Sequence, residues 1–181
     1  MKRIWFIAII TLLSGLTACN ESESLYCHIP ARLVVDNAYQ AQALYTACNS
    51  LGEFCSVTMD GKKIYFQGSK ETSELNRVAL GNYDNTILGL GGLIIGLPSL
   101  PEMGKDVSQV ACFDLNCPNC YEQYGGISKR MELSDGTAYC RGCNRTYSLN
   151  DRGIISKGEG GRSLFRYKVS YVGTALVVSN R

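Results

Sequence analysis

The sequence of 181 residues has few of the residues on which many functions depend: one histidine (His28), one tryptophan and four prolines. A single imidazole excludes sites that need several histidines from one chain, as many catalytic zinc sites do. The formal charge of +2 excludes a strongly basic nucleic-acid-binding domain and an acidic disordered chain. The apolar run at residues 4–13 is about half as long as the roughly 20 residues of a membrane-spanning helix. Cysteine, by contrast, is abundant, with nine residues.

The N-terminal segment 1–18 has a basic start, an apolar run and small residues before a cleavage site, which is the pattern of a secretory signal peptide. The motif Leu16-Thr17-Ala18-Cys19 resembles the bacterial lipobox. This resemblance implies that Cys19 is acylated and anchors the chain in the lipid bilayer, with residues 19–26 as the tether. By the same family's sorting rule, Asn20 implies an outer-membrane lipoprotein of the bacterial cell envelope. The alternative is an ordinary signal peptide whose cleavage site precedes a cysteine.

Short segments separated by turn signals cover most of the remaining chain. Asp60-Gly61 lies between two strand-like segments and is a strong hairpin signal. Asn37 is expected to cap one short helix that continues to Cys48, and the polar segment 69–76 is expected to form a loop. The glycine-rich apolar segment 87–100 predicts a buried strand with a tight bend. Further strands are predicted at 31–35, 54–59, 63–66, 107–113, 147–149, 164–169 and 175–178. The pattern indicates an all-β barrel or sandwich.

Four of the cysteines form two CxxC pairs, Cys117-Pro118-Asn119-Cys120 and Cys140-Arg141-Gly142-Cys143. A CxxC turn directs two sulfurs to one side of the backbone, and two such knuckles can surround one tetrahedral Zn²⁺ ion. The intervening residues 121–139 match the spacing of about 15 to 20 residues that is typical of zinc sites. In an oxidising compartment the alternatives are structural disulfides or thiol–disulfide exchange.

The other residues with chemical potential lie outside the two pairs. Cys27, Cys48, Cys55 and Cys112 are even in number, which favours one or two disulfides whose pairing the spacing leaves open; buried free thiols are the alternative. His28 is expected to be exposed or to act as a cap rather than to catalyse. Tyrosines near the pairs, such as Tyr147, are expected to shield the site, and Arg141 and Arg145 are expected to be solvated loop charges.

From Cys112 to its end the chain resembles the Rieske-type ferredoxin domain. Phe113-Asp114 precedes Cys117-Pro118, and the second pair is followed by Tyr147-Ser148-Leu149 and Gly153. A glycine-rich stretch at 158–160 then leads to two strand-like segments. The resemblance implies a small β fold with two cluster-binding loops. Cys117, Cys120, Cys140 and Cys143 stand at those loops, where Rieske centres use two cysteines and two histidines.

These observations predict a membrane-anchored lipoprotein with one domain, residues 27–181. The domain is a Rieske-like β-barrel or sandwich with a short helix and two metal-binding loops, whose four-cysteine site lies within 112–153. The expected cofactor is a structural zinc ion, with iron or a [2Fe–2S] cluster for electron transfer as the alternative. A disulfide-stabilised or thiol-exchanging envelope protein is the second alternative. No catalytic residue is identified, and no partner is predicted beyond the bilayer; a redox-active form is expected to carry electrons rather than to hydrolyse.

Overall fold

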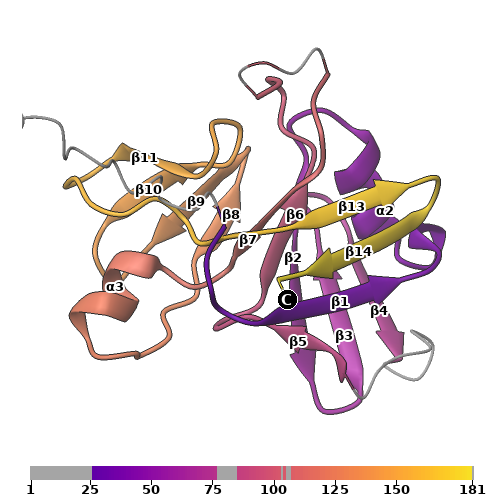
Figure 1. The fold of residues 1–181 in the computed structure, drawn as a ribbon, viewed down its shortest axis with the longest axis horizontal. Helices are drawn as coiled ribbons and strands as arrows, with labels where there is room; N and C mark the ends of the chain where they lie inside the picture. Colours follow the sequence, from indigo (N-terminus) through magenta and orange to yellow (C-terminus); the bar gives the residue numbers. More distant parts are fainter. Residues whose placement is uncertain (1–25, 77–84, 103, 105–106, 181) are drawn as a thin grey trace, which may run out of the picture.

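The computed structural model describes residues 26–76, 85–102, 104 and 107–180. The predicted signal peptide and Cys19 lie outside these residues. The described chain is mostly β and forms three antiparallel sheets (Figure 1), which confirms the predicted all-β class. None of the three sheets closes on itself within the described strands, so the fold is layered. No described helix has the length and apolar character needed to cross a membrane.

The first sheet joins the two ends of the described chain. Residues of β1 alternate between buried and half-buried positions, as expected for a strand with one face on the core. Leu33 of β1 lies opposite Val178 of β14, and both side chains are fully buried. The strand order is β13 (Val169–Val172), β14 (Ala175–Ser179), β1 (Ala31–Val35) and β5 (Ile87–Leu88).

The second sheet has six strands and contains the hairpin that Asp60-Gly61 predicts, with Asp60 opposite Lys63. Its edge strand β4 lies in the segment predicted to be a loop, so that prediction was wrong. Residues of β4 alternate between exposed and half-buried positions, and a strand with one face towards water tolerates polar side chains. The order is β12 (Arg166–Tyr167), β7 (Ala111–Asp114), β6 (Leu93–Gly96), β2 (Phe54–Asp60), β3 (Lys63–Gln67) and β4 (Thr72–Asn76).

The third sheet carries the second CxxC pair. It is a four-stranded antiparallel meander in which β9 ends at Cys140 and β10 begins at Arg145, so the pair occupies the turn between these strands. In Figure 1 it lies apart from β1 and β14, on the other side of β7. The order is β11 (Ile154–Lys157), β10 (Arg145–Ser148), β9 (Thr137–Cys140) and β8 (Glu132–Ser134).

Helical segments are short and differ in part from the prediction. Asn37 caps a 3₁₀ turn, η1 (Ala38–Gln40), and the main helix α2 (Gln42–Asn49) follows after a break at Ala41. A second helix, α3 (Pro118–Gln123), begins inside the first CxxC pair, where the sequence predicts a turn alone. Proline suits the first helical turn because its missing N–H would have no partner there.

Strands β6 and β7 are buried on both faces because they lie between two groups of apolar side chains. Ile95 and Cys112 face the core shared with α2 and β1. Ile94 and Phe113 face a second core, which contains Tyr147 of the third sheet and three of the CxxC cysteines. Complete burial of one large apolar side chain contributes about 1.5 to 3 kcal/mol. The second core therefore holds the metal-binding loops against the central sheet.

Candidate metal centre

The four CxxC sulfurs come together in one place. The Sγ atoms of Cys117, Cys120, Cys140 and Cys143 all lie within 4.8 Å of one another. Cys117 Sγ is 3.6 Å from Cys143 Sγ, and Cys120 Sγ is 3.6 Å from Cys140 Sγ, so the short distances join one pair to the other. The predicted convergence of the two pairs is confirmed.

The first knuckle lies where the segment after β7 ends and helix α3 begins. Cys117 is the N-cap of α3, and its carbonyl oxygen accepts a hydrogen bond from the N–H of Tyr121 at 3.0 Å. Its own N–H donates to the carbonyl oxygen of Lys129 at 2.9 Å, which ties the knuckle to the loop that returns from α3. Cys120 follows one turn later in the helix and is fully buried.

Asp114, at the end of β7, fixes the backbone that enters the first knuckle. Its buried carboxylate accepts hydrogen bonds from the N–H groups of Asn116 (2.7 Å) and Leu90 (2.8 Å) and from the Tyr167 hydroxyl (2.5 Å). Burial raises the pKa of Asp114 despite these bonds. Gly89 has a φ of 63°, and a Cβ atom there would collide with the Asp114 carboxylate, so this bend requires glycine.

The second knuckle is a tight turn between β9 and β10. The N–H of Asn144 donates to the carbonyl oxygen of Cys140 at 2.9 Å, and Asn144 has a φ of 56°, a conformation that asparagine tolerates better than most residues. A Cβ atom on Gly142 would lie 3.1 Å from Cys120 Sγ. Glycine at this position therefore allows the backbone of one knuckle to approach the sulfur of the other.

Tyr147 and Asn119 form a hydrogen-bonded chain that ends at the metal-binding sulfurs. The Tyr147 hydroxyl accepts a hydrogen bond from Asn119 Nδ2 at 2.8 Å and lies 3.2 Å from Cys117 Sγ. Since Asn119 is the donor in the first bond, the hydroxyl proton is available to the sulfur. Asn119 is held in turn by the backbone of Arg162, to which it both donates and accepts. Such outer contacts orient ligands and tune the metal.

Arg145 is buried beside Cys143, so the prediction of a solvated loop charge was wrong for this residue. Its guanidinium donates to the backbone carbonyl oxygens of Glu159 (2.8 Å) and Gly160 (3.2 Å), and these bonds compensate for the loss of water. Burial alone would raise the pKa of the Cys143 thiol. Hydrogen bonds from the Arg145 side chain and backbone, together with those from Cys117 and Cys120, outweigh that effect and lower the pKa of Cys143 to about 7.

The other thiols respond differently to their surroundings. Burial raises the pKa of Cys120, and burial also raises the pKa of Cys140. Both groups are therefore neutral at pH 7 when no ion is bound, whereas the lowered pKa of Cys143 favours its thiolate form. Binding of a cation would displace the protons, because the thiolate is the form that ligates metals.

The donor set fits a single tetrahedral ion. A zinc–sulfur bond of about 2.3 Å places the sulfurs of a regular tetrahedron about 3.8 Å apart. The two cross-pair distances of 3.6 Å are close to this value. Cys117, Cys120 and Cys140 are fully buried and Cys143 is partly exposed, so the four residues form an almost enclosed site.

The remaining cysteines of the described chain lie outside this site: Cys27, Cys48, Cys55 and Cys112. Cys55 on β2 and Cys112 on β7 both pair with Ile95 on β6, from opposite sides. Two strand spacings separate them by about 9.6 Å, whereas a disulfide needs Cα atoms within about 7 Å. The register thus excludes the Cys55–Cys112 pairing, and disulfides between the other combinations stay a prediction.

Comparison with known proteins returns no relative: no protein-family model matches the chain, and no curated protein matches it. The resemblance to Rieske domains therefore stays a prediction. His28, the only histidine, is exposed as expected. Sequence reasoning identified all four converging cysteines but missed Asn119 and the buried position of Arg145. The only signal for them was their nearness to the CxxC pairs.

Proposed function

We propose that this protein is a membrane-anchored lipoprotein whose β domain binds one Zn²⁺ ion through Cys117, Cys120, Cys140 and Cys143. The observation that carries the proposal is the convergence of four sulfurs within 4.8 Å, with cross-pair distances of 3.6 Å. Four-cysteine tetrahedral sites are a common form of structural zinc site. The ion would join α3 to the turn between β9 and β10.

The proposed role of the ion is structural. Four cysteine ligands complete a tetrahedron and leave no position for water or substrate, unlike catalytic zinc sites, which have three protein ligands. The site also lies in the second core. There the ion would connect α3 with the turn between β9 and β10, two elements that are separate in the sequence. In such sites the free energy of metal binding is largely free energy of folding.

A single ion fits the geometry better than a [2Fe–2S] cluster. A two-iron cluster distributes its cysteine ligands over two metal ions, two on each, and so holds the two pairs farther apart than one ion does. The short distances between all four sulfurs favour one ion. Zinc is preferred over a single iron because the closed four-thiolate tetrahedron is its usual structural arrangement, although iron uses the same ligands.

The metal proposal is tested by anaerobic purification of the full chain, followed by metal analysis and a visible absorption spectrum. One zinc per chain and no visible absorption would support the proposal. Bound iron with a red-brown colour would overturn it in favour of electron transfer, and a metal-free protein without free thiols at the four positions would favour disulfides. The Cys55→Ser variant is the matched control, because Cys55 is equally buried but lies outside the site.

The membrane anchor rests on the N-terminal sequence and has its own test. In a bacterial host, the chain with Cys19 is expected in the membrane fraction and is expected to incorporate a labelled fatty acid. The Cys19→Ser variant is expected to lose both properties but to retain one metal ion. Equal fatty-acid labelling of the variant and the unchanged chain would contradict the proposed acylation at Cys19.

A further inference from the structure

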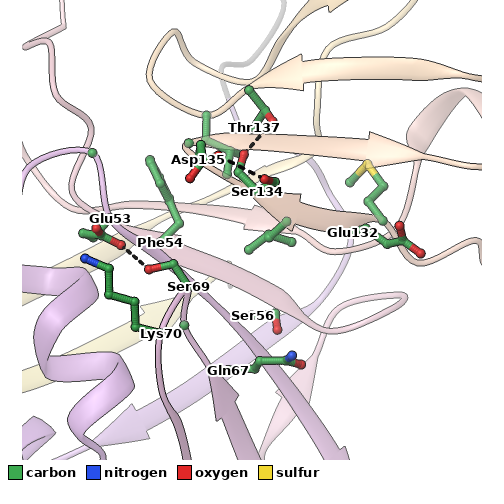
Figure 2. Close-up of a pocket in the computed structure, with 16 residues that line it drawn as sticks. Glu53, Phe54, Ser56, Gln67, Ser69, Lys70, Glu132, Ser134, Asp135 and Thr137 are labelled. Carbon is green, nitrogen blue, oxygen red and sulfur yellow. Dashed lines mark hydrogen bonds between the residues drawn. The ribbon is translucent and has the colours of Figure 1, made fainter.

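A cleft of about 540 Å³ lies between the six-stranded sheet and the third sheet, away from the four cysteines. One wall consists of the start of β2 and the end of β3 with the residues that follow it; the other is the β8–β9 hairpin (Figure 2). A second hollow of about 200 Å³ adjoins it towards α2 and shares the segments Glu53–Phe54 and Gly68–Lys70. The volume of the cleft alone is in the range of small-molecule sites.

The floor of the cleft is apolar and fixed by the second core. Phe54, Met131 and Leu149 are buried members of that core, and each also lines the cleft. The hairpin wall is fixed by its turn, in which Asp135 and Gly136 have φ angles of 44° and 70°. The N–H of Leu149 donates to the carbonyl oxygen of Gly136 at 2.9 Å, which ties this turn to the floor. The cleft is therefore preformed, which lowers the entropic cost of binding.

Uncharged polar side chains line both walls. Ser56 and Gln67 are paired residues on β2 and β3, and both line the cleft near Ser69 (Figure 2). Ser134 and Thr137 stand on the opposite wall, at the two ends of the hairpin turn. The Thr137 hydroxyl already donates to the carbonyl oxygen of Ser134 at 2.6 Å and the Ser134 hydroxyl to Asp135, so these two oxygens are left as acceptors. The Gln67 amide offers both donors and an acceptor.

Carboxylates outnumber lysines along the cleft, but each carboxylate has a partner. Glu132 forms an ion pair with Arg141 at 2.6 Å, and Glu53 accepts a hydrogen bond from Ser69 at 2.8 Å on the wall that also carries Lys70. Asp135, the remaining carboxylate, accepts a hydrogen bond from the Ser134 hydroxyl at 3.3 Å. The excess of carboxylates would repel a strongly anionic ligand. A polycation is also disfavoured, because the carboxylates already have partners.

We infer that this cleft binds a neutral, hydroxyl-rich chain, namely a short oligosaccharide. Its apolar floor suits the carbon faces of sugar rings, and the hydroxyl and carboxylate oxygens on both walls can accept hydrogen bonds from ring hydroxyls. An extended peptide is less favoured because β8, the free edge strand at the cleft, has only three residues to offer backbone hydrogen bonds.

The test is calorimetric titration of the full chain with maltohexaose, cellohexaose, xylohexaose and mannohexaose, each up to about 10 mM, which reaches the weak end of specific binding. At least one sugar is expected to bind. Ser56→Trp fills the cleft and is expected to lower the affinity by about tenfold or more, equivalent to 1.4 kcal/mol. Gln67→Ala, at an exposed position, removes one polar partner without placing bulk in the cleft and is also expected to weaken binding.

The matched control is Ser170→Trp, because Ser170 is exposed on β13 and does not line the cleft. It is expected to bind sugar as the unchanged chain does. The proposal is overturned if none of the four sugars binds, if Ser56→Trp and Gln67→Ala bind as well as the control, or if extended peptides occupy the cleft while the sugars do not. Metal content, measured on every variant, separates failure of this site from failure of the zinc site.

Discussion

Replacement of Cys140 with serine removes one of the four proposed ligands and leaves a buried hydroxyl in its place. Zinc binding contributes about 10 to 16 kcal/mol in small zinc-dependent folds, so one ligand of four accounts for about 2.5 to 4 kcal/mol. Cys140 is fully buried at the end of β9, so no water can replace its sulfur without entering the second core. For a domain of this size, the expected fall in melting temperature is about 5 to 16 °C.

The assay is differential scanning calorimetry of the full chain with and without a zinc chelator, together with metal analysis. Chelation is expected to lower the melting temperature of the unchanged chain strongly and that of Cys140→Ser only weakly, because the variant holds its ion less tightly. Cys55→Ser serves as the matched control. It alters an equally buried thiol in the first core and is expected to keep one ion and its full response to the chelator.

Two results would refute this reasoning. The first is an unchanged melting curve for Cys140→Ser with one tightly bound ion, which would show that its sulfur is not a ligand. The second is an equal loss of metal from Cys55→Ser, which would show that general destabilisation, rather than a missing ligand, releases the ion.

Three further results are expected at the same site. Tyr147→Phe removes the hydroxyl beside Cys117 Sγ but keeps the ring, and should weaken zinc binding by about 10- to 100-fold in a chelator competition. Zinc affinity should rise with pH between pH 6 and 8, because Cys120 and Cys140 have raised pKa values and must each release a proton to bind the ion. Calorimetry in buffers of different ionisation enthalpy counts the released protons. Zinc binding without any proton release would contradict this expectation. Metal-free protein treated with oxidised glutathione should form the disulfides Cys117–Cys143 and Cys120–Cys140, because the sulfurs of each of these pairs are 3.6 Å apart. Peptide mapping identifies the disulfides. Disulfides within each CxxC pair would contradict the geometry.

Local sequence signals predicted the elements that depend on neighbouring residues. The Asp60-Gly61 turn predicted a hairpin, and the bend in the glycine-rich segment lies between β5 and β6, where Gly89 needs a positive φ. The CxxC spacing predicted which four cysteines meet, because each pair fixes two sulfurs through its own backbone.

Long-range contacts decided what the sequence left open. Arg145 is buried because the carbonyl oxygens of Glu159 and Gly160 surround it, and nothing in its immediate sequence shows this. Segment 72–76 forms a strand because β3 supplies backbone partners along its whole length. Cys55 and Cys112 are separated by Ile95, a relation that exists only once three strands have paired.

Asn180 holds the two ends of the described chain together. Asn180 donates from its backbone to the carbonyl oxygen of Ala31 at 3.1 Å, and from its side chain to that of Ile29 at 3.1 Å. Adjacent ends permit circular permutation. A chain that joins residue 180 to residue 27 through a short glycine–serine linker, and opens at the exposed turn after Asp60, would keep all three sheets while it reverses the order in which the two halves are synthesised.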